Sequence, residues 1–374
     1  MIPGPQHPDL AVFVASLFHG GVGKMRVHLI NEIARCGYRV DLLIADRGSP
    51  YMDLVSPAVR LVQLRTSNAV TGIPGLGTYL LRRRPRVLLS QRVRVNVLAL
   101  RTRTLTRAAT RMFVTVNTNM TRELEALKPG KRERHLALLR RYYPRNDGII
   151  AVSHGVADDF ALLIGWPRGR IAVAPNPVVT PALAQQAAAP VDHPWLMPGA
   201  PPLVIGMGRL EPQKDFPTLL RAFARLRATH SCRLMILGEG KLRPELEALA
   251  TELGIRDEVA FPGFMANPYA YLARAALFVL SSRWEGSPNS LTEALALGTP
   301  LVSTDCPNGP REILENGKHG ALVPVGDAQA LADAMKHTLD QPPHRDALKA
   351  AAQRYTVERS ATAYIDALGL AGDR

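Results

Sequence analysis

Two glutamates eight positions apart stand where a predicted loop passes into a predicted helix. Glu285 lies in a Gly/Pro/Ser-rich stretch after an apolar strand predicted over 276–280, and Glu293 falls one turn into the helix. Ser287 is a suitable N-cap and Pro288 a suitable first helical residue, so the first backbone N–H groups of the helix lack partners within it. Such a helix end attracts phosphate. The spacing predicts a site that combines two carboxylates with a phosphate-binding helix end.

Two cations stand at the end of another predicted strand. Arg209 follows the apolar run 203–207, and Lys214 lies five residues on, before a helix that Asp215 is placed to cap. A diphosphate would accept charge-assisted hydrogen bonds from both cations, each contributing about 1.5 to 3 kcal/mol. The alternative is a surface Arg/Lys pair balanced by acids such as Glu211 and Asp215.

The two glutamates form an E-x7-E pattern that resembles the signature of the retaining glycosyltransferases of the family 4 type, which have the GT-B fold. The resemblance covers most of the chain and extends to Gly20-Gly21, Gly208-Arg209-Leu210, Gln213-Lys214-Asp215-Phe216 and Phe261-Pro262-Gly263-Phe264. It implies that Arg209 and Lys214 hold the donor diphosphate and that Glu293 binds the ribose hydroxyls. It also implies that Glu285 lies beside the donor sugar.

The resemblance implies a nucleotide-sugar site drawn from several segments. Phe264 and Met265 are expected to border the nucleobase, and the passage 306–312 resembles users of UDP-sugars and is expected to line the same site. The residues expected to bind the donor are Gly20, Gly21, Gly208, Arg209, Lys214, Phe264, Met265, Gly286, Ser287, Pro288, Asn289, Ser290, Leu291 and Glu293.

A histidine of the family is replaced here. Members often carry a histidine near the reacting sugar, after the fifth strand of the first domain, and the aligned residue is Asn117. An amide hydrogen-bonds but does not titrate. His154, which follows Ser153 at another predicted strand end, is the candidate imidazole; the alternative is a surface histidine that caps the next helix. The expected catalytic residues are Glu285, Arg209, Lys214 and His154.

The early glycine-rich loop around Gly20 and Gly21 invites a different interpretation. A phosphate-binding P-loop needs Ser or Thr after its lysine, but Lys24 is followed by Met25. The G-x-G-x-x-G spacing of a dinucleotide fold also fails. Without a Cβ, the two glycines let the backbone approach the donor sugar and phosphate; a purely structural tight turn is the alternative.

Apolar strand-like runs alternate with helical patterns along the whole chain, which predicts α/β domains with doubly wound parallel sheets. We predict two Rossmann-like domains facing a cleft, in the GT-B arrangement. Residues 1–178 form the acceptor-side domain, 179–202 a Pro/Ala-rich linker and 203–354 the nucleotide-sugar domain. The resemblance implies that the last helix, within 355–374, packs back on the first domain.

Composition bounds the class of protein. The chain has 374 residues, 47% of them hydrophobic, which suffices for two globular cores. Its three cysteines, Cys36, Cys232 and Cys306, are too few and too scattered for a disulfide framework or a zinc cluster, so we expect a reducing compartment and no metal site. The apolar run 10–18 lacks a basic leader and is interpreted as a strand. No run reaches the 18 or so apolar residues of a spanning helix.

Basic charge is concentrated in the first half. Through Arg170 there are 27 Lys/Arg and 11 Asp/Glu residues, whereas the remainder holds 19 and 21. Ten arginines and no acid occur between Arg82 and Arg111, a segment we call the arginine belt, and a further basic cluster spans 128–145. We expect the belt to dock on an anionic membrane at the inner, cytoplasmic face, where a lipid-linked acceptor is presented. Nucleic-acid binding is disfavoured because few aromatic residues accompany the arginines, and a solvated surface is the remaining alternative.

The implied reaction transfers a glycosyl group from a nucleotide diphosphate sugar, with uracil as the expected base, to a hydroxyl of a glycan or lipid-linked glycan. Retention of configuration follows from the resemblance, and no metal or other cofactor is expected because the cations oppose the charge of the leaving diphosphate. A nucleotide-sugar epimerase or a phosphorylase on the same architecture remains an alternative, as does a nucleic-acid-binding protein.

Overall fold

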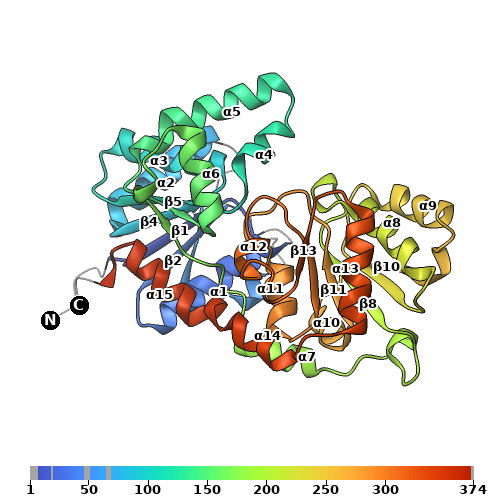
Figure 1. Cartoon of the computed structure of the whole chain (residues 1–374). Coiled ribbons are helices and arrows are strands. Elements are labelled where there is room, and N and C mark those ends of the chain that lie inside the picture. The colour runs from blue at the N-terminus through green and yellow to red at the C-terminus, as the bar shows by residue number, and fades with distance from the viewer. Residues whose placement is uncertain (1–6, 18–19, 46–50, 65–68, 372–374) are drawn as a thin grey trace. The chain divides into compact units, whose positions relative to one another are not determined.

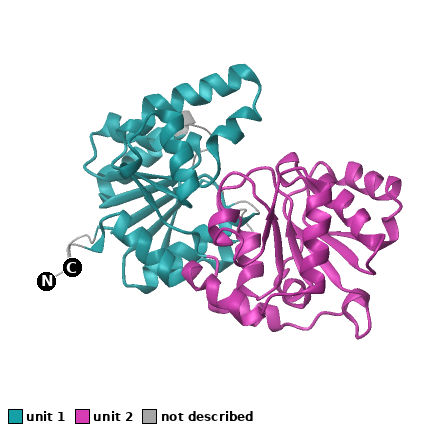
Figure 2. Ribbon diagram, viewed as in Figure 1, with its two compact units in different colours: residues 1–177, 357–374 teal, residues 178–356 magenta. Residues whose placement is uncertain are grey.

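A computed structural model describes residues 7–17, 20–45, 51–64 and 69–371. The chain divides into two α/β units (Figure 2). Unit 1 comprises residues 1–177 and 357–374, and unit 2 comprises residues 178–356. Each unit contains one parallel sheet with helices packed on its faces (Figure 1). The predicted pair of doubly wound domains is therefore confirmed.

The unit 1 sheet has the strand order β3-β2-β1-β4-β5-β6-β7, with all pairs parallel. Its strands are β1 (Leu10–Val14), β2 (Val40–Ile44), β3 (Val59–Gln63), β4 (Val87–Gln91), β5 (Arg111–Val116), β6 (Gly148–Ala151) and β7 (Ile171–Val173). The helices are α1 (Gly21–Arg35), α2 (Ala69–Arg83), α3 (Val93–Thr106), α4 (Met120–Glu125), α5 (Pro129–Tyr142), α6 (His154–Ile164) and α15 (Val357–Ala367).

The central strands of unit 1 are buried on both faces, as expected for a parallel sheet covered by helices. Strand β1 shows how the faces divide, because alternate side chains point to opposite sides. Ala11 and Phe13 join one core cluster, while Leu10, Val12 and Val14 join another. The second cluster includes residues of α1 and α15, so the C-terminal helix is part of this core.

The unit 2 sheet repeats the same pattern with the order β10-β9-β8-β11-β12-β13. Its strands are β8 (Leu203–Met207), β9 (Arg233–Leu237), β10 (Val259–Gly263), β11 (Leu277–Leu280), β12 (Leu301–Thr304) and β13 (Ala321–Val323). The helices are α7 (Pro181–Ala188), α8 (Phe216–Arg227), α9 (Arg243–Glu252), α10 (Tyr269–Arg274), α11 (Asn289–Ala296), α12 (Pro310–Ile313), α13 (Ala328–Asp340) and α14 (Arg345–Ala351).

The segment 179–202 differs from the linker that its composition predicts. It contains α7, which Thr180 caps by accepting a hydrogen bond from the backbone N–H of Leu183. Leu183 and Ala187 are buried in a core cluster of unit 2. The Pro/Ala-rich composition conceals a short amphipathic helix, and this segment belongs to unit 2.

Both sheets have one switch point, where consecutive crossovers pass to opposite sides of the sheet. It lies between β1 and β4 in unit 1 and between β8 and β11 in unit 2. In open α/β sheets, ligands bind outside the carboxyl ends of the strands at this point. These two places are where functional side chains are expected.

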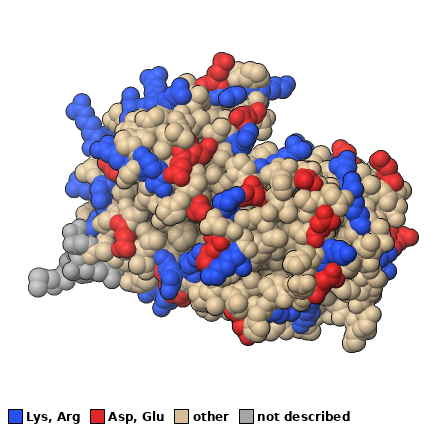
Figure 3. Space-filling view, in the orientation of Figure 1, with Lys and Arg blue, Asp and Glu red and all other residues tan. Residues whose placement is uncertain are grey.

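The arginine belt runs from the end of α2 through β4 and α3 to the first residue of β5. Figure 3 shows Lys and Arg side chains along the outer edge of unit 1. Several belt arginines have local partners: Arg103 pairs with Asp147, and Arg111 donates to the carbonyl of Leu368, 2.6 Å away. The apolar residues interleaved with the belt, Leu80, Val93, Val95, Val97 and Leu98, are buried or partly buried, and Leu81 is exposed.

Within the described residues, no helix is long and apolar enough to cross a membrane.

His28 on α1 gives unit 1 a pH-dependent stability. Its Nδ1 lies 3.0 Å from the carbonyl oxygen of Pro177, and burial lowers the pKa of His28 to about 4. Between about pH 6.5 and pH 4 the unfolded chain binds a proton that the folded chain does not, so this stability is present above pH 6.5 and is lost on acidification. We expect a loss of about 2 kcal/mol between pH 7 and pH 5.

Urea unfolding of the wild type and of His28→Gln at both pH values tests this expectation. The variant should show a smaller difference between the two pH values, and His135→Gln on α5 should retain the wild-type difference. The same pH dependence in His28→Gln and the wild type would contradict the assignment.

Candidate functional site

The connection from β8 to α8 brings Lys214 back across the end of its own strand. A Cβ on Gly208 would lie 2.8 Å from Lys214 Cε, so the glycine makes room for the lysine side chain. The Lys214 carbonyl accepts a hydrogen bond of 2.8 Å from Ser281 Oγ, just beyond β11. The lysine is thereby fixed at the switch point of unit 2.

Glu285 meets Lys214 at this switch point. The Lys214 Nζ and Glu285 Oε1 atoms are 2.5 Å apart, and the two side chains are only 14% and 8% exposed. Ser282 Oγ donates to the same carboxylate oxygen at 2.7 Å, and the backbone N–H of Glu285 donates to the carbonyl of Pro307. The sequence predicts both charged residues as site residues, and the structure joins them in a buried ion pair.

Arg209 has a different environment. Its guanidinium is 62% exposed, lies 2.8 Å from Glu211 and donates to Gln213 Oε1 at 3.4 Å. Gln213 in turn donates to the carbonyl of Trp284, next to Glu285. The pairing with Glu211 matches the surface alternative, while Gln213 connects Arg209 to the loop of Glu285.

Asp215 does not cap α8 in the way predicted. It occupies the N-cap position with a left-handed backbone, but its carboxylate accepts no hydrogen bond from the helix backbone. The carboxylate accepts instead from Thr218 Oγ1 at 2.9 Å and pairs with Arg283 at 3.2 Å. Asp215 therefore ties α8 to the loop after β11.

The start of α11 also differs from the prediction by one residue. Pro288, not Ser287, is the N-cap; its backbone is extended, and its carbonyl accepts from the N–H groups of Leu291 and Thr292. Asn289 is the first helical residue and Ser290 the second. The ring of Pro288 fixes a negative φ that suits either position, so composition alone does not separate them.

Glu293 is buried within α11. Its Oε1 accepts a hydrogen bond of 2.9 Å from the hydroxyl of Tyr269 on α10. Tyr269 orients the acid, and no motif or spacing in the sequence singles out this tyrosine.

The passage 306–312 packs on the Glu285 loop. A Cβ on Gly309 would meet Pro288 Cδ at 2.5 Å and the Gly286 carbonyl oxygen at 3.0 Å, so only glycine permits this approach. Burial raises the pKa of the Cys306 thiol, and the negative charge of Glu285 adds to the rise. Cys306 is therefore a packed thiol close to Glu285.

Phe264 and Met265 follow β10 directly but differ in environment. Phe264 is 56% exposed, whereas Met265 packs against a core cluster of unit 2. Of the two residues, only Phe264 presents most of its side chain to solvent beyond the strand end.

The unit 1 candidates lie at separate strand ends. Gly20 precedes α1 with φ 124°, a conformation that favours glycine, and its N–H donates to the Tyr51 hydroxyl; Gly21 begins the helix. His154 begins α6 and is exposed, with Nδ1 3.3 Å from Arg168. Ser153, not His154, caps that helix. Asn117 lies beyond β5, and its amide is 3.5 Å from Thr115 Oγ1.

Comparison with known proteins agrees with this geometry. The family described as "Glycosyl transferases group 1" matches residues 192–355, and the "Glycosyl transferase 4-like domain" matches residues 20–177. The chain belongs to the GT-B glycosyltransferases of the family 4 type. The two matches coincide closely with the two units.

Curated relatives are about one third identical to this chain over about half of its length. A lipopolysaccharide core biosynthesis glycosyltransferase, LpsE of Rhizobium meliloti, is 35% identical over 52% of this chain and 54% of its own length. A Campylobacter jejuni N-acetylgalactosaminyltransferase acting on a diphospho-undecaprenol glycan is 31% identical over 57% and 56%. The chain thus spans about half the length of these relatives.

Solved structures match the fold over nearly the whole chain. The outer core galactosyltransferase WaaB aligns with a TM-score of 0.73 and 18% identity, covering 96% of this chain and 98% of that one. Anabaena HepE in complex with UDP-glucose aligns with a TM-score of 0.76 and 18% identity, covering 97% and 100%. These similarities establish the GT-B fold.

Proposed function

We propose that this protein transfers a sugar from a UDP-sugar to a hydroxyl group of a glycan or lipid-linked glycan, with retention of configuration and without a metal ion. The observation that carries the proposal is the buried Lys214–Glu285 pair at the switch point of unit 2. A cation and an acid share this place with the exposed guanidinium of Arg209 and the start of α11.

These groups fit the departure of a diphosphate. As the bond between the anomeric carbon and the diphosphate oxygen breaks, negative charge grows on the leaving oxygen. Lys214, Arg209 and the first N–H groups of α11 oppose that charge from fixed positions. The acceptor oxygen bonds to the same face of the anomeric carbon, and its proton passes to the leaving diphosphate. Glu285, beside Lys214, stabilises the positive charge that develops on the sugar.

The relatives support the class of substrate. LpsE is named for lipopolysaccharide core synthesis, the Campylobacter enzyme for an undecaprenol-linked glycan, and HepE is solved with UDP-glucose. By analogy, we propose a role in the synthesis of a cell-surface polysaccharide or glycoconjugate.

A donor screen tests the proposal. UDP-, GDP-, ADP- and dTDP-sugars are each incubated with the full chain and glycan acceptors, and products are identified by mass spectrometry and NMR. We expect a glycosidic product with the donor's anomeric configuration from a UDP-sugar. An isomerised donor or phosphorolysis without transfer would favour the epimerase or phosphorylase alternative. A product with the opposite anomeric configuration would contradict the proposed retention.

We also propose that unit 1 binds reversibly to an anionic membrane at the cytoplasmic face. Arg82 and Arg84 are exposed at the end of α2, and Arg83 is half-buried. Each basic residue near such a surface contributes about 1 kcal/mol, which salt screens. Because the interleaved apolar side chains are mostly packed in the core, this attraction is chiefly electrostatic.

Vesicle sedimentation checks this expectation. Binding should require anionic lipid, fall with added salt and fall again when Arg82, Arg83 and Arg84 are changed to Glu. The same change at Lys131, Arg132 and Arg134 on α5 measures the contribution of the second basic cluster. Equal binding to neutral vesicles, or no binding to either kind, would leave the belt as solvated surface.

A further inference from the structure

The switch point of unit 1, between β1 and β4, holds a buried arginine. Arg26 on α1 is only 4% exposed, and its side chain faces the sheet. Its Nε and Nη2 atoms donate to Gln91 Oε1 at 3.1 and 2.8 Å, and Nη2 lies 3.2 Å from Thr115 Oγ1. Gln91 ends β4 and Thr115 lies near the end of β5, so the guanidinium is anchored at the carboxyl ends of the central strands.

The charge of Arg26 is not balanced by any described residue. Gln91 and Thr115 are neutral, and Arg26 Nη1 has no hydrogen-bond partner within the described part of the chain. The ring of Tyr364 lies 5.9 Å from Arg26 Cζ, and its hydroxyl is a neutral hydrogen-bonding neighbour of the guanidinium, so Tyr364 supplies no negative charge. Burial lowers the pKa of Arg26, yet a guanidinium in a protein remains protonated. An unpaired buried cation is costly, so the fold retains a strong preference for an anion here.

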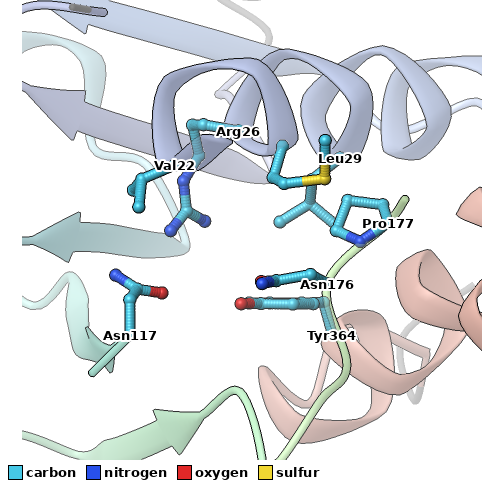
Figure 4. A pocket seen from close by; sticks show the side chains of 8 residues that line it. Val22, Arg26, Leu29, Asn117, Asn176, Pro177 and Tyr364 are labelled. Carbon is cyan, nitrogen blue, oxygen red and sulfur yellow. The ribbon is translucent and has the colours of Figure 1, made fainter. Parts of the chain in front are cut away.

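A small cavity of about 10 Å³ lies next to the guanidinium (Figure 4). Val22, Met25, Leu29 and Pro177 form its apolar wall; Asn117, Asn176 and Tyr364 are its other polar lining residues. None of the lining residues is acidic. Figure 4 shows the Asn117 amide and the Tyr364 hydroxyl around the same space as the guanidinium. The volume accommodates one oxygen atom, about the size of a water molecule.

We propose that this pocket binds one oxygen of an anionic group, a carboxylate or a phosphate, carried by the acceptor. Arg26 Nη1 supplies the charge and a hydrogen-bond donor, and the Asn117 amide and the Tyr364 hydroxyl supply further donors. The apolar wall excludes water from the ion pair and strengthens it. That the anion belongs to the acceptor rests on the proposed function; the anion site itself does not.

The competing occupant is a single water molecule. Water would satisfy Arg26 Nη1 but would leave the buried charge without a counter-ion. The two cases therefore differ in whether anions stabilise the folded chain, and the experiment measures that difference.

Thermal unfolding of the full chain is measured in acetate, inorganic phosphate and glucuronate, against chloride at matched ionic strength and against glucose as the neutral sugar. We expect at least one oxyanion to raise the Tm of the wild type saturably, by about 3 °C at ten times its Kd. Arg26→Met should abolish the rise, and Arg359→Met, which removes an exposed arginine of α15, should retain it. No rise in the wild type, or an equal rise in Arg26→Met, would overturn the proposal.

Asn117→Asp provides a second test if Arg26→Met does not fold. The new carboxylate faces the guanidinium and supplies an internal counter-ion, so we expect a higher Tm in chloride and no further rise with oxyanions. A wild-type response to oxyanions in Asn117→Asp would also overturn the proposal. A response to acetate and glucuronate identifies a carboxylate ligand, and a response to phosphate identifies a phosphate ligand.

The same measurements separate this site from the proposed transfer reaction. If oxyanions stabilise the chain through Arg26 but the donor screen gives no glycosidic product, the anion site stands and the proposed function falls. If transfer occurs but no oxyanion stabilises the wild type, the proposed function stands and the anion site falls.

Discussion

Replacing Lys214 with alanine is expected to lower turnover about a hundredfold, the usual scale for the loss of one preorganised charge-stabilising donor. The reason is its position: Nζ lies at the switch point of unit 2, 2.5 Å from Glu285, where the leaving diphosphate is proposed to bind. The measurement is kcat and KM with a UDP-sugar. Lys241→Ala removes an exposed lysine of the same unit and should leave both constants unchanged.

Loss of the ion pair must be distinguished from loss of catalysis. Lys214→Ala leaves Glu285 buried without its cation, and breaking a buried pair in this way costs about 3 to 5 kcal/mol of stability. The double variant Lys214→Ala with Glu285→Gln removes both charges, so we expect it to regain much of the lost Tm but none of the activity. Wild-type turnover in a folded Lys214→Ala variant would contradict the proposed role of Lys214 in the reaction.

The two glutamates are expected to affect different kinetic constants. Glu285→Gln should lower kcat about a hundredfold if its charge acts beside the reacting sugar. Glu293→Gln should mainly raise the KM of the donor, by about tenfold, because an amide is a weaker acceptor for two ribose hydroxyls. Gln preserves the size of each side chain, so the comparison concerns charge and hydrogen bonding.

Tyr269→Phe is the matched control for Glu293. It removes the hydroxyl that donates to Glu293 Oε1 but keeps the carboxylate and the aromatic ring. We expect a smaller rise in KM than for Glu293→Gln and no change in kcat. If Glu293→Gln lowered kcat and Glu285→Gln raised only KM, the proposed roles would be exchanged.

The sequence predicted the architecture well because the strands of a doubly wound sheet are buried on both faces. Runs such as Leu203–Met207 are continuously apolar and are separated by helical patterns, so their identity needs no tertiary information. Capping was predicted less accurately. Ser287 and Pro288 both suit a helix start, and the choice depends on how Gly309 packs against them.

The contacts that build the site could not be predicted in the same way. Lys214 and Glu285 are 71 residues apart, and their meeting depends on β8 and β11 being neighbours at the switch point. The burial of Arg26 could not be predicted either. On a helix, an arginine is ordinarily interpreted as surface, and only the structure shows that its side chain turns inward to Gln91.

Helix α15 has a consequence for how the protein is made. Tyr364 and Ile365 of this helix, with Leu368 just beyond its end, are buried beside β1 and α1, although a whole second unit separates them in the chain. On the ribosome, domains generally fold in the order in which they emerge. Here the first unit to emerge lacks part of its core until the residues after unit 2 have been made, so its apolar surface stays open while unit 2 is translated. A nascent chain stalled before residue 357 should therefore expose a chaperone-binding surface on unit 1.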